Sequence, residues 1–290
     1  LNKDGNDIEL DLYESCTRGQ TSECLRLKIY HKDKPITLSD ILPIIGHMGL
    51  RVIAESPHSI KPVGEKSDIW IHDLSLESKD QSGAKIDVAE IKANFEETLL
   101  KLWYKEMEDD ALNSLVTLAN LSWRDVYLLR AYMKYMKQIR YQHGQAVIIK
   151  ALNTHADIAR NLTRLFEARF NPALKEDREK TTKKFVTAIK KQLEKVKRLE
   201  FDHVFRSMID LIMNTVRTNF YQKGDANGLK PYISFKIKSK QIEEIPAPRP
   251  WAEIFVYSPG FEGVHLRGGP IARGGLRWSD RLDDFRTEVL

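Results

Sequence analysis

The chain has 290 residues, of which 42% are hydrophobic and 30% are charged, and its net charge is +5. This composition is typical of a globular protein that is long enough for two or three domains. No run of about 18 apolar residues is present, which argues against a membrane protein, and the two cysteines, Cys16 and Cys24, are too few for a disulfide scaffold and favour a cytoplasmic location.

The N-terminal part of the chain predicts a small unit of strands and helices. Residues 1–22 are polar and turn-rich, and they indicate a linker or a strand remnant of a preceding domain. Alternating apolar residues then predict a strand over 24–31. A short helix over 38–48 follows, and Gly49 is expected to end it.

Two more strands and a second helix complete this unit. Alternation over 50–55 and 67–76 predicts the strands, and Ile69, Ile71 and Leu74 are the candidates for the buried side of the second one. Apolar residues then recur every three or four positions from Val88 to Leu102, which predicts a helix.

The order of elements over 23–102 is that of a ferredoxin-like βαββα unit that lacks only its last strand. In this order the unit resembles the ACT domains, small regulatory modules that often bind amino acids where two of them pair. The turn at 31–37 lacks the glycine of the amino-acid-binding members, so a structural or dimer-forming role is favoured over effector binding. Because such units expose unpaired sheet edges, we expect a homo-oligomer.

Residues 103–229 predict a helical bundle, with no strand signal before position 222. Ser122 and Asp125 have the spacing of a capping box at the start of one helix. A second helix is predicted from Asn153 until Asn171 and Pro172 interrupt it, and a third is predicted as one long helix over about 177–220. The apolar stripes of these helices indicate core packing and no cofactor site.

The excess positive charge lies in the third predicted helix. Residues 175–200 contain ten lysines and arginines against five acids, and apolar residues interrupt them at helical spacing. A solvated helix face is favoured over a nucleic-acid surface, because no stacking aromatic residues and no nucleic-acid motif accompany the charges. No nucleic-acid partner is therefore expected.

Residues 230–290 predict the first strands of an α/β catalytic domain, so the expected class of the whole chain is α+β. Alternation predicts a strand over 231–238, and a proline-rich connector follows at 246–250. Two neighbouring strands over 251–257 and 264–267 are expected to be joined at Pro259 and Gly260.

A segment rich in glycine and arginine begins in the last predicted strand and continues beyond it. We call residues 263–281 the glycine–arginine motif; its sequence is Gly-Val-His-Leu-Arg-Gly-Gly-Pro-Ile-Ala-Arg-Gly-Gly-Leu-Arg-Trp-Ser-Asp-Arg. Glycine lets backbone N–H groups approach a ligand, and arginine presents a fork of donors that matches a carboxylate or phosphate. The motif therefore predicts an anion site. It lacks the Gly-x-Gly-x-x-Gly spacing of a dinucleotide fingerprint, so no cofactor-binding residue is assigned.

The stretch 273–289, Arg-Gly-Gly-Leu-Arg-Trp-Ser-Asp-Arg-Leu-Asp-Asp-Phe-Arg-Thr-Glu-Val, resembles the segment that opens the catalytic domain of the large-subunit, NAD-dependent bacterial glutamate dehydrogenases. In smaller glutamate dehydrogenases the matching stretch reads Lys-Gly-Gly-Ile/Leu-Arg, and its lysine helps to hold the substrate carboxylate. Arg273 stands at the position of that lysine. The resemblance implies a substrate-binding set made of Arg273, Gly274, Gly275 and Arg277.

The structural alternative for Arg273 and Arg277 is a salt bridge to Asp280, Asp283 or Asp284. For the neighbouring arginines Arg267, Arg281 and Arg286, a structural role is expected. The scattered histidines show no ligand spacing, so no metal site is expected.

The resemblance also implies the reaction: oxidative deamination of L-glutamate to 2-oxoglutarate and ammonia, with NAD as the hydride acceptor. The catalytic lysine and the NAD-binding domain are expected beyond Leu290, so this chain alone is expected to be an inactive part of the enzyme. One alternative is a regulatory amino-acid-sensing or oligomerisation module without catalysis of its own. A weaker alternative is a nucleic-acid binder that uses the basic helix.

Overall fold

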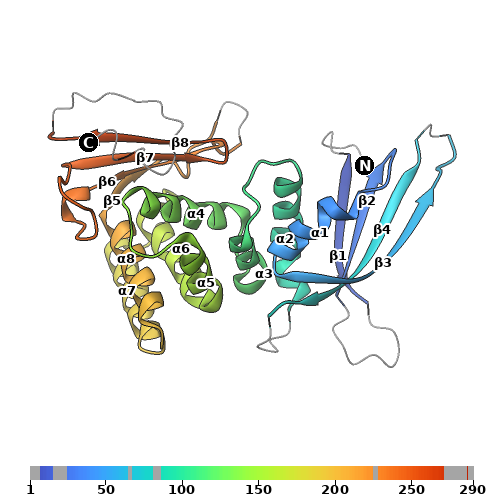
Figure 1. Ribbon diagram of the computed structural model, residues 1–290, viewed down its shortest axis with the longest axis horizontal. Coiled ribbons are helices and arrows are strands. Elements are labelled where there is room, and N and C mark those ends of the chain that lie inside the picture. The colour runs from blue at the N-terminus through green and yellow to red at the C-terminus, as the bar shows by residue number, and fades with distance from the viewer. Residues whose placement is uncertain are drawn as a thin grey trace. The chain divides into compact units, whose positions relative to one another are not determined.

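The structure is a computed structural model that describes residues 7–15, 25–64, 67–80, 86–224, 228–270 and Arg286. The chain divides into two compact units, Leu1–Val126 and Tyr127–Leu290, and Figure 1 shows a sheet and helices in each. The predicted mixture of α and β structure is confirmed. Both cysteines lie outside the described residues.

The first unit contains a four-stranded antiparallel sheet with the strand order β1-β2-β4-β3. Its strands are β1 (Ile8–Glu14), β2 (Leu25–Lys32), β3 (Leu50–Ile60) and β4 (Ile69–Ser78). Helix α1 (Leu38–His47) follows β2, and helix α2 (Val88–Trp103) follows β4. The predicted βαββα order is confirmed by these elements.

Strand β1 completes the sheet from the N-terminal side. The sequence predicts a linker or a remnant of another domain for 1–22, but Ile8 and Leu12 are buried in the core of this unit, and β1 pairs with β2 along its whole length. In a ferredoxin-like unit the last strand pairs with the first one. Strand β1 occupies that position here. The strand that the βαββα order lacks is therefore formed by residues that precede the other elements in the chain.

The buried side of β4 differs in part from the predicted one. Of the three candidates, only Leu74 is fully buried, and His72 and Leu76 are buried on the same face. Ile69 and Ile71 are half-buried and lie on the opposite face. Side chains alternate along a strand, so these two sets exclude each other. The polar His72 fits the core because its Nε2 accepts the backbone N–H of Ile36 at 3.0 Å and its Nδ1 lies 2.6 Å from Glu55.

Local signals set the ends of the first unit's helices. Gly49 follows α1 with a φ of +86°, a left-handed conformation that favours glycine. At the start of α2, the Asp87 carboxylate accepts the backbone N–H groups of Ala89 and Glu90. The short helices η1 (Ala111–Ser114) and α3 (Leu115–Ala119) follow α2 in the chain.

Five helices lie between α3 and the second sheet, two more than the sequence predicts. They are α4 (Trp123–Gln138), α5 (Gln145–Thr154), α6 (Ala156–Phe170), α7 (Arg178–Leu193) and α8 (Leu199–Asn214). The capping box before α4 is confirmed: Ser122 Oγ accepts the backbone N–H of Asp125, and the Asp125 carboxylate accepts that of Ser122. The division between the two units falls inside this helix.

The predicted third helix is two helices and a strand. Helices α7 and α8 are separate, and β5 (Thr215–Thr218) follows α8 directly. Residues 194–198 between the helices contain neither glycine nor proline, so the sequence carries no signal of the break. Strand β5 fits its residues, because Thr215, Val216 and Thr218 are β-branched and favour extended structure.

The second sheet is also antiparallel, with the order β5-β6-β7-β8. Its other strands are β6 (Ile233–Ile237), β7 (Ala252–Ser258) and β8 (Phe261–Arg267), which confirms the three strands predicted for this region. The turn between β7 and β8 lies at Pro259 and Gly260, as predicted. Among the described parts of the chain, no helix is long and apolar enough to cross a membrane.

Helix α4 packs on this sheet through three buried tyrosines. The ring centroids of Tyr127 and Tyr257 are 4.9 Å apart, and those of Tyr135 and Phe255 are 5.4 Å apart. Tyr132 stacks on Phe235 at 4.3 Å. Offset and tilted aromatic pairs of this kind stabilise beyond their buried area. The inward side chains of β6 and β7 thus form one core with α4.

The burial of β1 gives a prediction about stability. Leu12→Ala should lower the free energy of unfolding of the first unit by about 2–5 kcal/mol, because it leaves a cavity at a fully buried position. Glu9→Ala is the matched control, since Glu9 lies on the same strand but is exposed on the other face, and it should cost less than about 1 kcal/mol. Urea denaturation measures both. Equal small losses would mean that β1 is not part of the core.

Candidate functional site

The structure describes the frame of the predicted anion site. Arg273, Gly274, Gly275 and Arg277 lie outside the described residues, as does Arg281. The chain is described up to Pro270 on one side of them, and Arg286 is described on the other. The contacts of these two flanks show where the glycine–arginine motif is attached to the fold.

The first flank leaves the sheet beside the start of β7. In the β7–β8 hairpin, Leu266 pairs with Glu253 and Arg267 pairs with Ala252. The guanidinium of Arg267 donates to the backbone oxygen of Pro270 at 2.6 Å. Arg267 therefore braces the backbone just after β8, in line with the structural role predicted for it.

The second flank returns to the same place through a buried ion pair. The guanidinium of Arg286 makes two bonds to the Glu253 carboxylate, from Nε to Oε2 at 3.0 Å and from Nη2 to Oε1 at 2.7 Å. Both side chains are almost fully buried, with exposed fractions of 2% and 0%. This bidentate geometry fixes the guanidinium in direction as well as position. The structural role predicted for Arg286 is confirmed.

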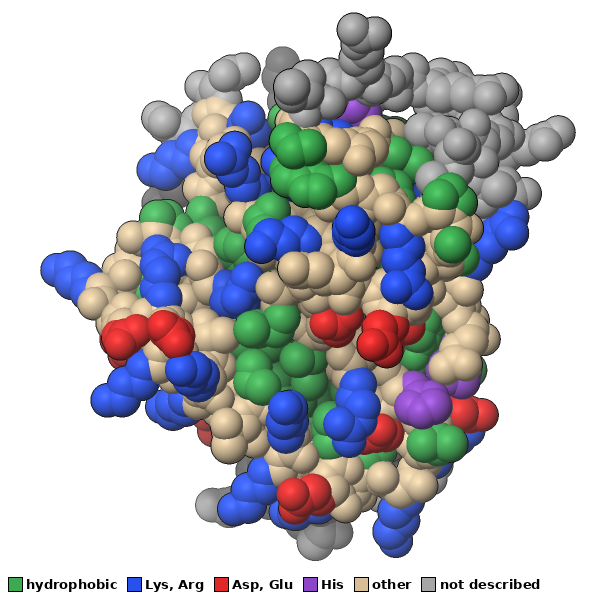
Figure 2. All heavy atoms as spheres, turned by 90° about the vertical axis from the view of Figure 1, so that its left-hand side faces the viewer, with side chains coloured by type: hydrophobic (Ala, Val, Ile, Leu, Met, Phe, Trp, Pro, Cys, Tyr) green, Lys and Arg blue, Asp and Glu red, His purple; other side chains and the backbone are tan. Residues whose placement is uncertain are grey.

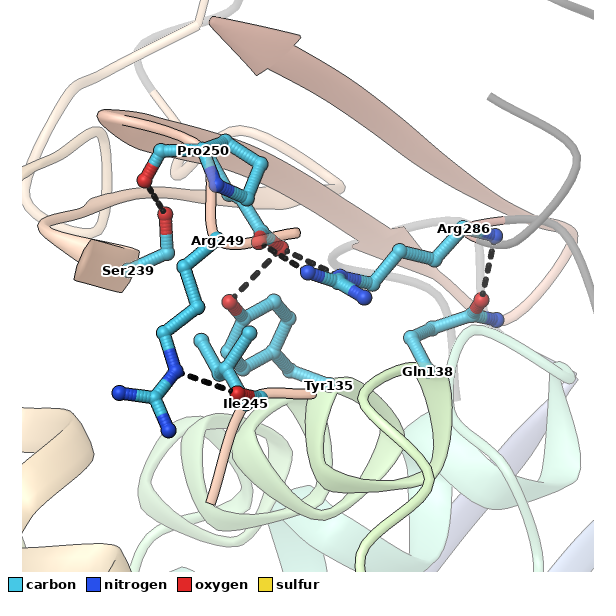
Figure 3. Close-up of polar contacts among 8 residues, drawn as sticks. Tyr135, Gln138, Ser239, Ile245, Arg249, Pro250 and Arg286 are labelled. Carbon is cyan, nitrogen blue, oxygen red and sulfur yellow. Dashed lines mark hydrogen bonds and ion pairs between the residues drawn. The ribbon is translucent and has the colours of Figure 1, made fainter. Parts of the chain in front are cut away.

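Tyr135 and Gln138 of α4 complete this network (Figure 3). The Tyr135 hydroxyl donates to Glu253 Oε2 at 2.9 Å, and the backbone N–H of Arg286 donates to Gln138 Oε1 at 3.3 Å. Burial, and next the nearby Glu253 carboxylate, raise the pKa of Tyr135 well above its usual value. The phenol therefore keeps its proton and serves as a donor at physiological pH.

Gln138 links Arg286 to the β7–β8 hairpin. Its Nε2 donates to the carboxylate of Glu262 on β8 at 2.8 Å, while its Oε1 accepts from Arg286. One amide side chain thus contacts the strand that leads into the motif and a residue that follows it. The two flanks of the motif are held by a shared set of α4 and β7 side chains.

The proline-rich connector before β7 is also fixed by polar contacts, which Figure 3 shows next to the ion pair. Arg249 Nε donates to the backbone oxygen of Ile245 at 2.7 Å, and the Ser239 hydroxyl donates to that of Pro250 at 3.0 Å. These contacts set where β7 begins, and Glu253 is the second residue of that strand.

Glu253, Tyr135 and Gln138 were not predicted from the sequence as parts of a site. One signal was present: Glu253 interrupts the apolar alternation of β7 on the same side as Phe255 and Tyr257, which are both fully buried. A charge at an inward position requires a partner. Its partners, however, come from α4 and from Arg286, and nothing in the local sequence points to them.

The network is suited to positioning and has no catalytic geometry of its own. Its acid is neutralised by an arginine, its phenol is protonated, and all three side chains are buried away from water. Within the described ranges, no group of three or more His, Cys, Asp or Glu side chains could hold a metal ion. The arrangement fixes the two described flanks of the motif, the end of β8 and Arg286.

The buried pair gives a prediction about stability. Arg286→Met should lower the free energy of unfolding by about 3–5 kcal/mol, because the Glu253 carboxylate is left buried without its cation. The double variant Glu253→Leu/Arg286→Met should recover most of this loss. Urea denaturation of both variants measures the effect.

The control is Arg206→Ala, which removes a surface ion pair with Asp202 whose arginine is 58% exposed. It should cost at most about 1 kcal/mol. A loss for Arg286→Met no larger than for this control would contradict the role of the ion pair as an anchor.

Three family models match consecutive parts of the chain. Residues 7–91 match the ACT3 domain of glutamate dehydrogenase, residues 107–172 match its helical motif 3, and residues 188–290 match the catalytic domain of bacterial NAD-glutamate dehydrogenase. The first match includes β1, and the third begins in α7, ahead of the predicted boundary at position 230.

Curated relatives show the same similarity along the chain. An NAD-specific glutamate dehydrogenase of Pseudomonas aeruginosa is 47% identical over 287 residues, which is 98% of this chain, and one of Halomonas elongata is 42% identical over 290 residues, or 99% of it. One of Mycobacterium tuberculosis is 39% identical over 261 residues, or 88% of the chain. The chain spans only 16–17% of the length of these relatives.

Proposed function

Because the chain belongs to the family of bacterial NAD-glutamate dehydrogenases, we propose that it acts as part of an enzyme that oxidises L-glutamate to 2-oxoglutarate and ammonia. NAD would accept the hydride. The residues that bind NAD, and the catalytic lysine, would lie outside these 290 residues. The three matched modules occur in the chain in one continuous order, and this is the observation that carries the proposal. The 290-residue chain by itself is then expected to be inactive.

Within this enzyme, we propose that Arg273, Gly274, Gly275 and Arg277 bind a carboxylate of glutamate. Support comes from the chemistry of the motif, which offers guanidinium donors and glycine backbone N–H groups to an anion. Further support comes from the two flanks of the motif, since Arg286 forms an ion pair with Glu253 beside the end of β8. A site whose flanks are fixed holds its ligand groups more accurately than a free loop.

The control for a test of Arg273 follows from the structure. The solvated helix face predicted over residues 175–200 includes Arg178, but the guanidinium of Arg178 donates to the backbone oxygens of Arg169 and Asn171 at 2.7 and 2.8 Å. Arg178 therefore caps the end of α6, and its loss would disturb the fold. Lys190, an exposed residue of α7, is the better control for the loss of a positive charge.

Arg273→Ala in the intact enzyme should raise the KM for glutamate roughly ten- to a hundredfold and leave the KM for NAD nearly unchanged. Loss of a charge-assisted contact costs about 1.5–3 kcal/mol, which corresponds to that range. Lys190→Ala should change neither constant. A KM for glutamate within about twofold of the parent would place Arg273 in a structural ion pair instead.

We also propose that the enzyme is a cytoplasmic homo-oligomer and that β3 contributes a contact between copies. β3 is one of the two outer strands of the first sheet, and Ile53 and Ile60 on it are each 51% exposed. The other outer strand is covered, since the Glu96 carboxylate of α2 accepts the backbone N–H of Leu12. An uncovered outer strand is a template for pairing with another chain. Cell fractionation tests the location.

Light scattering of the 290-residue chain should therefore show a species larger than the monomer. Ile53→Lys should shift it towards the monomer, because a charge on an outer strand opposes pairing. Val63→Lys, at a fully exposed position beyond β3, is the matched control and should leave the mass unchanged. A monomeric parent at high concentration would contradict the proposal.

A further inference from the structure

The outward face of the second sheet carries opposed positive charges. Arg217 on β5 and Lys236 on β6 are register partners, so they lie directly opposite each other across the strands. Like charges in this position destabilise a sheet. Neither side chain forms an ion pair within the described part of the chain. In Figure 2, lysines and arginines clearly outnumber acids on the side of the second unit that faces the viewer.

Two depressions meet at this pair of cations. The first has a volume of about 680 Å³, and its lining includes Phe170, Tyr221, Tyr232, Asn219, Gln222 and Arg267. The second has a volume of about 510 Å³ and is lined by Lys238, Lys240 and Trp251, among others. Arg217 and Lys236 line both, and among the described residues no aspartate or glutamate lines either one. The two depressions therefore form one continuous surface, with the tyrosine rings at one end and Lys238 and Lys240 at the other.

Aromatic rings and cations also lie in contact around this surface. Lys236 Nζ is 5.3 Å from the centroid of the Trp251 ring, and Arg267 Cζ is 5.8 Å from it. Lys230 Nζ lies 5.8 Å from the Tyr232 ring. The Arg267 Nε is buried and has no hydrogen-bond partner among the residues that the structure describes. The surface thus offers unneutralised donors and flat apolar faces side by side.

We propose that these two depressions form one site for a nucleoside polyphosphate. The base would lie in the first depression against the tyrosine rings, because a π-face stacks on a base of any kind. The phosphates would lie over Arg217 and Lys236 and reach towards Lys238 and Lys240. An anion between Arg217 and Lys236 removes their mutual repulsion, and guanidinium and ammonium groups are the usual phosphate ligands.

The size of the surface and the separation of its two ends select this class of ligand. The first depression falls within the range of about 300–1,000 Å³ that is typical of small-molecule sites. Inorganic phosphate would not use the aromatic end, and a nucleoside would leave the cations unpaired. The site is independent of the proposed glutamate chemistry and of the NAD site, which that proposal puts outside this chain.

Isothermal titration of the 290-residue chain with ATP tests the proposal. ATP should bind one site, and tripolyphosphate and AMP should each bind at least about tenfold more weakly, because each lacks part of the contacts. Arg217→Gln/Lys236→Gln should weaken ATP binding at least about tenfold, and the matched control Lys190→Gln/Lys191→Gln should change it less than about twofold. Circular dichroism checks that each variant is folded.

Tyr232→Leu separates the two ends of the site. It should weaken the binding of ATP and leave that of tripolyphosphate unchanged. Four results would overturn the proposal: no ATP binding at about 1 mM, equal affinities for ATP and tripolyphosphate, equal losses in the two double variants, or tighter binding of a single-stranded oligonucleotide than of ATP.

Discussion

The second unit is organised around one buried charge, the carboxylate of Glu253. A carboxylate on the inward side of a strand is costly unless donors surround it. Here the donors are the guanidinium of Arg286 and the hydroxyl of Tyr135, which lie 33 positions after Glu253 and 118 positions before it in the chain. Apolar contacts tolerate exchange and sliding, but a bidentate ion pair does not. This interaction therefore specifies which segments meet beside the end of β8.

The tyrosines of α4 extend the same principle along the sheet. Each ring packs in the core, and each hydroxyl has a different polar partner. These are the backbone oxygen of Pro231 just before β6 for Tyr127, the hydroxyl of Thr215 on β5 for Tyr132, and the carboxylate of Glu253 on β7 for Tyr135. Burial raises the pKa of Tyr132 as well, so this hydroxyl also stays protonated. The helix is thus held in register by hydrogen bonds as well as by the burial of its apolar face.

Periodicity predicted most of the elements, and it was insufficient where two periods overlap. The sequences around Leu27, Phe235 and Val264 alternate between apolar and polar residues, as half-buried strands do, and the structure has strands at all three places. The break before α8 and the strand at Thr215 were not predicted, because no glycine or proline marks the break and Val216 fits a helical stripe as well as a strand. Similarly, Ile71 was expected to be buried, but alternation alone does not tell which face of a strand is inward, and the buried side chains are those of His72, Leu74 and Leu76.

The candidate site, like the fold, could be predicted from the sequence only in part. The motif with Arg273 is visible in the sequence because its residue types are unusual at that density. Its supporting residues are not visible, since Gln138 and Tyr135 lie in an ordinary amphipathic helix and acquire a role only through contacts over long separations. Sequence thus indicates the groups that would meet a ligand, and the fold indicates what holds them.

The early position of β1 changes how the first sheet can assemble. In the usual ferredoxin-like order, the strand beside the first one arrives last and must close a loop around the whole unit. Here Glu14 pairs with Leu25, and Ile8 pairs with His31, so the same neighbour is joined by a short connection. Loop closure costs less entropy when the paired residues are close in sequence, and folding is faster when contacts are local. During synthesis, this hairpin can form as soon as β2 has left the ribosome, before β3, β4 or α2 has emerged from it.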